Sequence, residues 1–157
     1  MNCFFSQGNI YKKYKKGDLI KKTPFSYVYL SNPLDNLDTK CIIKIQNRYK
    51  HLHNISLEIK ILKLLQPLVV TPDLLYDEMT CIWNYQVFKY IDGVTLDEYL
   101  KSGREKKDLI PELLSGFKEI QRYKIMHRDI KLDNIMIENN HVKIIDFGLS
   151  CYQSNLT

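Results

Sequence analysis

Two polar segments near the C-terminal end constrain this chain more than any other feature. The first is His127-Arg128-Asp129-Ile130-Lys131-Leu132-Asp133-Asn134, and the second is Asp146-Phe147-Gly148. Between them, residues 135–137 and 142–145 are short apolar stretches, which predict two strands joined by a tight turn at Asn139-Asn140. The fold therefore has to place two groups of polar side chains at the ends of one hairpin.

The residue types in these segments suit the transfer of a phosphoryl group. This chemistry needs a carboxylate to accept the proton of a hydroxyl, a cation beside the phosphates, and ligands for a metal ion. Asp129 can serve as the carboxylate and Lys131 as the cation. Asn134 and Asp146 offer the oxygen donors that magnesium prefers. The alternative is that these are chance loop residues, and the specificity of the combined pattern argues against it.

The pattern H-R-D-x-K-x-x-N, followed by D-F-G at hairpin spacing, resembles the eukaryotic-type protein kinase family over roughly residues 20–150. The lysine two positions after Asp129 is typical of serine/threonine kinases. The resemblance implies an α+β, two-lobed fold with a β-rich N-lobe and a shortened, mainly helical C-lobe. It also implies one kinase-like domain over residues 1–157, with the N-lobe at 1–88, a hinge at 89–93 and the C-lobe at 94–157.

Periodicity and turn residues predict the other elements. In the first half, we expect strands at 25–30 and 40–46, a helix at 53–66, and a hairpin of 74–76 and 81–90 that turns at 77–80. In the second half, we expect helices at 96–100 and 111–123.

The resemblance also implies an ATP site. Lys44 would bind the α- and β-phosphates and pair with Glu58, while Val28 and Ile42 would cover the adenine from above. The remaining candidates are the gatekeeper, a hinge residue and the apolar floor: Phe88, Tyr90 and Met136. The alternatives are a strand lysine at 44, a solvated glutamate at 58, and core roles for the apolar residues.

Three further side chains match the stacked apolar spine of the family. These are Leu62, His127 and Phe147.

The pattern departs from the family at the phosphate-binding loop. Counted back from Val28, this loop should occupy residues 21–26, which contain no glycine. Glycines allow main-chain N–H groups to approach phosphates, and Pro24 removes one such donor. Ile42 also stands where a small alanine is usual. A loosely held nucleotide is expected, although Lys21 and Lys22 could supply side-chain charge instead.

Nine residues follow Gly148, so we expect a truncated or minimal kinase without the later helices, and a frayed polar end. The helix predicted at 111–123 would then need cover for its apolar side chains, Leu113, Leu114, Phe117 and Ile120. A homodimer or a partner protein could provide that cover.

The leading hypothesis is an ATP-dependent serine/threonine protein kinase that uses Mg²⁺ to transfer the γ-phosphate to a protein hydroxyl. The alternative is a kinase-like regulatory module, a pseudokinase with little or no turnover. The missing glycines favour the module, and the intact polar set argues against it. A third possibility is a fragment of a longer protein.

Composition narrows the remaining classes. The net charge is +5, and six lysines gather near the N-terminus with Tyr11 and Tyr14: Lys12, Lys13, Lys15, Lys16, Lys21 and Lys22. A solvated arm explains them more simply than a nucleic-acid site. No apolar run approaches the ~20 residues of a membrane span, and the four cysteines lack metal-ligand spacing. We expect no membrane or nucleic-acid partner and a cytoplasmic location, in a host cell if the chain is a viral or effector protein.

Overall fold

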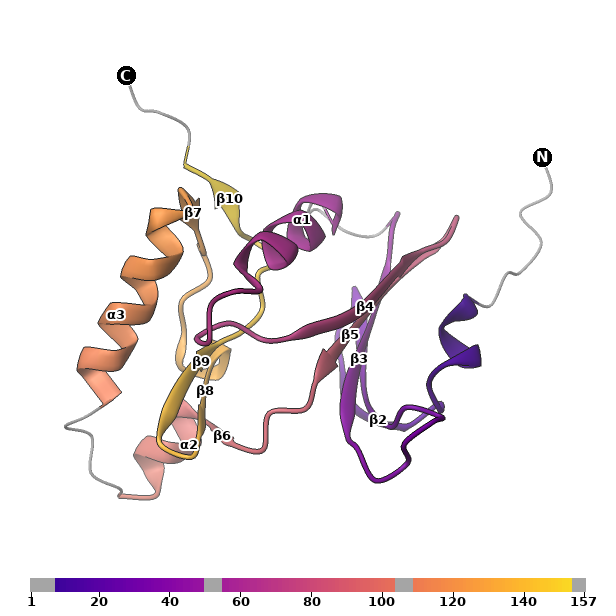
Figure 1. Cartoon of the computed structure of the whole chain (residues 1–157), viewed down its shortest axis with the longest axis horizontal. Helices are drawn as coiled ribbons and strands as arrows, with labels where there is room; N and C mark the ends of the chain where they lie inside the picture. The colour runs from indigo at the N-terminus through magenta and orange to yellow at the C-terminus, as the bar shows by residue number, and fades with distance from the viewer. Residues whose placement is uncertain (1–7, 50–54, 104–108, 154–157) are drawn as a thin grey trace. The chain divides into compact units, whose positions relative to one another are not determined.

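The computed structural model describes residues 8–49, 55–103 and 109–153, which divide into two compact units (Figure 1). Unit 1 comprises Met1–Ile55 and Asp73–Tyr90, and unit 2 comprises Ser56–Pro72 and Ile91–Thr157. The chain passes from unit 1 to unit 2 after Tyr90, within the segment 89–93 expected as a hinge. The segment 56–72 belongs to unit 2, whereas the sequence placed it in the N-lobe.

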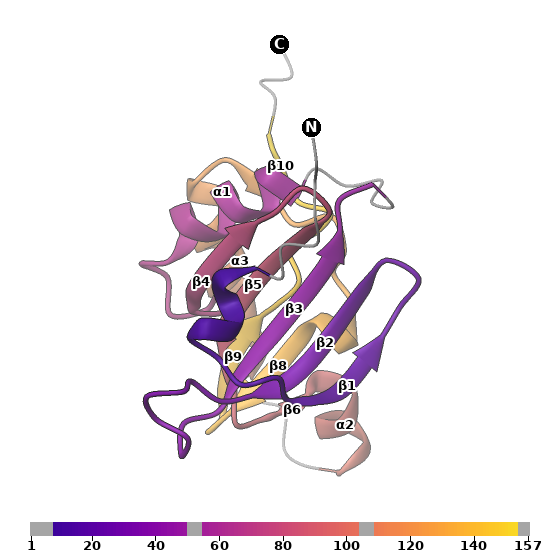
Figure 2. The ribbon, with the colours of Figure 1, turned by 90° about the vertical axis from the view of Figure 1, so that its right-hand side faces the viewer.

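Unit 1 contains a five-stranded antiparallel sheet with the order β1-β2-β3-β5-β4 (Figure 2). Its strands are β1 (Asp18–Lys22), β2 (Ser26–Ser31), β3 (Cys41–Asn47), β4 (Leu74–Met79) and β5 (Trp83–Lys89). The strands predicted at 25–30 and 40–46 are confirmed as β2 and β3. β1 was not predicted, because its five residues are all exposed and show no alternation.

The hairpin of β4 and β5 turns later than the sequence indicated. β4 continues to Met79, so the predicted turn at 77–80 is wrong and the chain reverses at residues 80–82. Thr80 closes this turn, since its N–H donates to the carbonyl of Trp83 at 2.8 Å and its Oγ1 accepts from the Trp83 N–H at 3.0 Å. Glu78 consequently stays in the strand.

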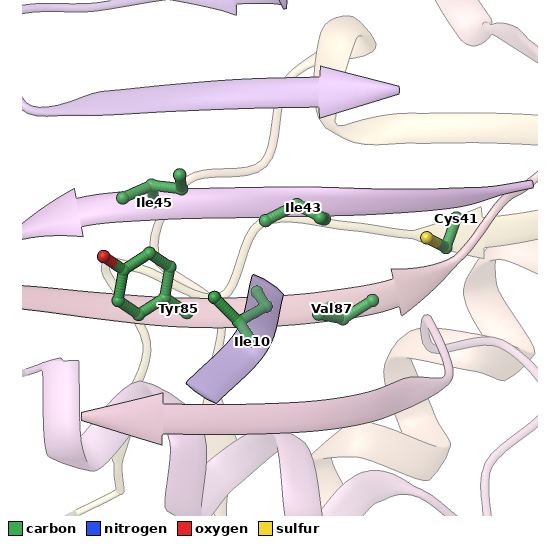
Figure 3. Packing of buried hydrophobic residues seen from close by; sticks show 6 residues of the cluster. All are labelled: Ile10, Cys41, Ile43, Ile45, Tyr85 and Val87. Carbon is green, nitrogen blue, oxygen red and sulfur yellow. The ribbon is translucent and has the colours of Figure 1, made fainter. Parts of the chain in front are cut away.

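The core of unit 1 covers one face of the sheet (Figure 3). It consists of alternate residues of β3 and β5 together with one residue of a short 3₁₀ helix, η1 (Asn9–Lys12): Ile10, Cys41, Ile43, Ile45, Tyr85 and Val87. Ile10 is fully buried. Glu78 fixes η1, because its carboxylate accepts the N–H groups of Asn9 at 2.8 Å and Ile10 at 2.9 Å. The segment expected as a solvated arm therefore packs on the sheet in part, while its lysines remain exposed.

Unit 2 contains three α-helices and two small antiparallel sheets, with strand orders β6-β8-β9 and β10-β7, among its described residues. The helices are α1 (Ile55–Leu65), α2 (Leu96–Lys101) and α3 (Leu109–Arg122). The strands are β6 (Val94–Thr95), β7 (Ile125–Met126), β8 (Ile135–Glu138), β9 (His141–Ile144) and β10 (Cys151–Tyr152), and η2 (Leu132–Asn134) is a 3₁₀ turn. All three predicted helices and the 135–145 hairpin are confirmed, within two residues at each described end.

Local chemistry explains two of these elements. Thr95 begins α2 with a capping box, in which its side chain accepts the N–H of Glu98 and Glu98 accepts the N–H of Thr95. Asn139 and Asn140 form the β8–β9 turn with φ angles of 50° and 65°. Two consecutive left-handed residues match the twist of a two-residue hairpin, and asparagine tolerates this conformation.

The segment after α1 is fastened to the β8–β9 hairpin. The carbonyl of Val70 accepts the N–H of Ile144 at 2.8 Å, and Nζ of Lys143 in β9 donates to the carbonyl of Val69 at 2.5 Å. α3 also packs closely here, because a Cβ on Gly116 would lie 2.5 Å from Cγ2 of Val70. These contacts account for the place of 56–72 in unit 2.

The apolar side chains of α3 are only partly covered by neighbouring elements. Ile120 is buried and Leu113 and Phe117 are half-buried, but Leu114 is 55% exposed. Among residues 8–49, 55–103 and 109–153, no helix combines the length and the apolar character that a bilayer crossing requires.

Candidate active site

Asp129 lies at the centre of a hydrogen-bonded loop in unit 2. Its Oδ2 accepts hydrogen bonds from Nζ of Lys131 at 2.8 Å and from Nδ2 of Asn134 at 2.7 Å. The same Nδ2 donates to the main-chain carbonyl of Asp129 at 2.9 Å. The η2 turn places Asn134 for these contacts, since its N–H donates to the carbonyl of Lys131 at 3.0 Å.

These contacts favour the ionised carboxylate. The ammonium of Lys131 and, to a lesser extent, the amide of Asn134 hold the pKa of the Asp129 carboxyl below its usual range. Asp129 likewise raises the pKa of Lys131. At neutral pH the loop therefore presents a carboxylate that can accept a proton and an ammonium beside it.

Asp146 enters the same region at the end of the β8–β9 hairpin. The N–H of Ile145, directly before it, donates to the main-chain carbonyl of Asn134 at 2.8 Å. Asp146 is exposed and has a φ of 62°, and Arg128 has a φ of 66°. Left-handed conformations cost a residue other than glycine roughly 1–3 kcal/mol, and such strain clusters at functional sites.

A buried histidine and phenylalanine join the two segments. The rings of His127 and Phe147 meet edge to face, with centroids 4.8 Å apart. Nδ1 of His127 accepts the N–H of Asp129 at 3.3 Å, so Nε2 carries the proton and donates to the carbonyl of Ile145 at 3.0 Å. Burial lowers the pKa of His127, which agrees with a neutral ring. Leu62, the third expected member of the apolar spine, is buried in α1.

Glu58 is buried, with 3% of its surface exposed, so the alternative of a solvated helix residue is wrong. It lies in the first turn of α1 rather than in mid-helix. A Cβ on Gly148 would lie 3.3 Å from Oδ1 of Asp146 and 3.8 Å from Oε2 of Glu58. The Glu58 carboxylate therefore lies beside the Asp-Phe-Gly segment. Its pairing with Lys44, which belongs to unit 1, stays a prediction.

Asn134 and Asp146 fit a divalent cation of the magnesium type. Nδ2 of Asn134 donates to Asp129, which leaves Oδ1 as the side-chain atom suited to a metal. Hard cations such as Mg²⁺ use one or two protein oxygens and complete their shell with water and phosphate. Within the described part of the chain, no three His, Cys, Asp or Glu residues form a metal-binding group, so a site closed by protein ligands is not found there.

Four of the expected ATP-binding residues share one face of the sheet in unit 1. Val28 pairs with Lys44 across β2 and β3, and Ile42 pairs with Phe88 across β3 and β5. Residues directly opposite in an antiparallel pair point to the same side, and so do residues two apart along a strand. All four are half-buried, and the core cluster covers the other face. Tyr90 follows β5, with Nζ of Lys40 5.3 Å from its ring centroid.

The last expected member of the ATP site lies in unit 2. Met136 is a half-buried residue of β8, between the buried residues Ile135 and Ile137. It pairs with Thr95 of β6 and Lys143 of β9.

The sequence did not predict that the residues directly after Gly148 adopt a defined structure. Ser150 is buried, and its Oγ donates to the main-chain carbonyl of His127 at 3.1 Å. Cys151 and Tyr152 form β10, which pairs with Met126 and Ile125 of β7. The expected frayed end is therefore wrong up to Gln153. A signal existed in the apolar pair 125–126, which is long enough to hold a two-residue strand.

Comparisons with known proteins point to the protein kinase family. A family model described as the protein kinase domain matches residues 27–157. A SNF1-related protein kinase catalytic subunit alpha, KIN12, of Arabidopsis thaliana is 30% identical over 126 residues, which is 71% of this chain and 24% of that protein. A probable serine/threonine-protein kinase KIN1 homolog of Encephalitozoon cuniculi is 40% identical over 79 residues, 46% of this chain and 14% of that protein.

A bacterial protein kinase also matches this chain over a small part of its own length. The serine/threonine-protein kinase PrkC of Bacillus subtilis is 32% identical over 79 residues, 46% of this chain and 12% of that protein. The chain thus spans less than a quarter of the length of the curated relatives it matches. A family match over most of the chain, together with the loop around Asp129 and the hairpin that carries Asp146, shows that this chain belongs to the protein kinase family, of the eukaryotic serine/threonine type.

Proposed function

We propose that the chain is an ATP-dependent protein kinase that transfers the γ-phosphate to a serine or threonine hydroxyl of a protein. The observation that carries this proposal is the Asp129 carboxylate, which accepts hydrogen bonds from Lys131 and Asn134, while the main chain of Asn134 is hydrogen-bonded to Ile145, directly before Asp146. Each of these groups has a part in phosphoryl transfer.

The reaction assigns one task to each side chain. Asp129 orients the attacking hydroxyl and accepts its proton as the oxygen forms a bond to the γ-phosphorus. The bond between this phosphorus and the bridging oxygen breaks, and ADP leaves. Lys131 offsets negative charge on the transferred group. Bound Mg²⁺ would neutralise phosphate charge, with Asn134 and Asp146 as its protein ligands.

The remaining polar residues would serve the nucleotide. Lys44 would contact the phosphates and Glu58 would orient Lys44, while the apolar face of Val28, Ile42 and Phe88 would contact the adenine.

A second candidate function, a regulatory module with little turnover, is favoured by one observation: residues 21–26 contain no glycine for binding phosphate. A protein partner or second copy over the exposed Leu114 side of α3, and a cytoplasmic location, stay predictions.

The test is transfer of labelled phosphate from Mg-ATP to the chain itself and to a generic substrate such as casein. Asp146→Ala should lower the initial rate at least a hundredfold, because it removes a metal ligand. Asp38→Ala is the matched control, since Asp38 is an exposed residue of the β2–β3 connection. Equal incorporation by wild type and Asp146→Ala would reject catalysis. Nucleotide binding without incorporation would favour the regulatory module.

A further inference from the structure

The turn between β1 and β2 has no main-chain donor left for a phosphate. The N–H of Thr23 donates to the carbonyl of Ser26 at 2.9 Å. Oγ1 of Thr23 accepts the N–H groups of Phe25 at 3.2 Å and Ser26 at 2.9 Å, and Pro24 has no N–H. Backbone loops bind phosphates through such N–H groups. Here the Thr23 hydroxyl and the Ser26 carbonyl already accept them, so any phosphate contact from this turn has to come from side chains.

A β-bulge decides which side chains of β1 face which side of the sheet. Leu19 pairs with Tyr29, but the next pair is Lys21 with Val28, so Ile20 is an extra residue. In a regular register without the bulge, Lys21 would pair with Tyr27 instead of Val28, and its side chain would point to the opposite face. The bulge thus places Lys21 on the Val28 side.

The neighbouring lysine confirms this orientation independently. Lys22 pairs with Tyr27, and its Nζ lies 5.6 Å from the centroid of the Tyr27 ring. Tyr27 pairs with Ile45 and packs against the core cluster, so Lys22 lies on the core side of the sheet. Successive residues of a strand point to opposite faces, which again assigns Lys21 to the other side.

Lys21, Val28 and Lys44 therefore form one row across three strands. Neighbouring strands lie about 4.8 Å apart, so the Cα atoms of the two lysines are separated by roughly 10 Å. Both long side chains leave the same face, and Lys21 is exposed. Two ammonium groups at this spacing can contact one polyphosphate.

We propose that Lys21 is a phosphate-binding residue of the nucleotide site, where its ammonium replaces the donors that the 23–26 turn lacks. This assignment rests on the proposed function, in which ATP binds at the Lys44 face. An exposed lysine contributes modestly, and its contribution is screened by salt. Loss of one such contact should weaken Mg-ATP binding about threefold to fivefold, with no effect on a ligand that has no phosphate.

The experiment measures dissociation constants of the full chain for Mg-ATP and for adenosine, by calorimetry, at low and high salt. Lys21→Met keeps the aliphatic stem and removes the charge, and Lys22→Met is the matched control one position along. We expect Lys21→Met to weaken Mg-ATP alone and to reduce its salt dependence. Lys21→Arg should retain wild-type affinity, and Lys22→Met should change neither ligand by more than about twofold.

The outcomes distinguish the assignment of Lys21 from the proposed function on which it rests. Equal Mg-ATP affinity for Lys21→Met and Lys22→Met, or an equal loss of adenosine binding, overturns the assignment of Lys21 and leaves the proposed function standing. Failure of the wild-type chain to bind Mg-ATP rejects the nucleotide site itself, and the role of Lys21 with it. Unchanged thermal unfolding midpoints would show that both exposed substitutions leave the fold intact.

Discussion

Asp129 accepts hydrogen bonds from Lys131 at 2.8 Å and from Asn134 at 2.7 Å, and both stabilise its charged form. The resulting low pKa, for which Lys131 is the larger cause, keeps the carboxylate deprotonated in mildly acidic solution. The acid side of the pH–rate profile should therefore not be limited by Asp129 until the pH falls below the usual range of an aspartate.

Lys131→Met tests this electrostatic role. Removing the ammonium raises the pKa of Asp129, so the acid limb of kcat/KM should move to higher pH, in addition to any loss of rate. The measurement is a pH–rate profile from about pH 3 to 8, and the position of the limb is the readout. Lys118→Met, an exposed change on α3, should leave it in place. An acid limb at the same pH in all three proteins would contradict the role of Lys131.

The proximity of Asp129, Lys131 and Asn134 could be predicted from sequence because the three lie within six residues of one another, and their catalytic role stays a prediction. Their exact contacts could not, since the donation of Asn134 to the main-chain carbonyl and to Oδ2 of Asp129 depends on the η2 turn. Ser150 and Thr23 escaped prediction for a different reason. A hydroxyl that satisfies a neighbouring backbone group looks the same in sequence as one that is solvated.

Elements with strong periodicity were predicted, and elements made by tertiary pairing were not. The apolar alternation of β3 and the amphipathic pattern of α3 can be recognised from the residues of each element alone. In contrast, β6, β7 and β10 are two residues long and exist through their partners. The η1 helix contributes one buried side chain, Ile10, so its lysine-rich surroundings dominated its pattern.

Ile10→Ala tests whether η1 is part of the fold of unit 1. Ile10 is fully buried against the sheet, so its truncation should reduce the free energy of unfolding by about 2–4 kcal/mol. Urea unfolding measures the loss. Leu37→Ala, at a position 60% exposed, is the control and should change stability by less than about 0.5 kcal/mol. Equal stability of both variants would mean that η1 does not support the sheet in solution.

Across the whole molecule, an intact polar loop around Asp129 is combined with a first hairpin that lacks phosphate-binding glycines. The residues proposed for phosphoryl transfer, Asp129 and the metal-ligand candidates, lie in unit 2. Nucleotide affinity would depend on side-chain charge in unit 1, at Lys21 and Lys44. Charge contacts at exposed positions weaken with ionic strength, so the activity of such a kinase should depend on salt more than that of a kinase with backbone phosphate contacts.

His127 connects a local contact to the stability of the whole chain. Its ring is buried and neutral when folded, with a lowered pKa, whereas in the unfolded chain its pKa is near 6.5. Below about pH 6.5 the unfolded chain therefore binds more protons than the folded chain. The free energy of unfolding then decreases as the pH is lowered, until the folded pKa is reached. Above that range the contribution of the neutral ring is fully present. The charged neighbours Asp129 and Asp146 oppose this shift, but burial is the larger cause.

The prediction is a fall in the free energy of unfolding between about pH 7 and pH 5 that depends on His127. His127→Tyr keeps an aromatic ring against Phe147 and does not titrate in this range, so its stability should vary less with pH than that of wild type. His141→Gln is the control, because His141 is an exposed residue whose ring contacts Glu112 at the surface. Urea titrations at several pH values give the slopes. If His127→Tyr and wild type lost stability equally on acidification, the buried neutral histidine would not be the group that couples pH to folding.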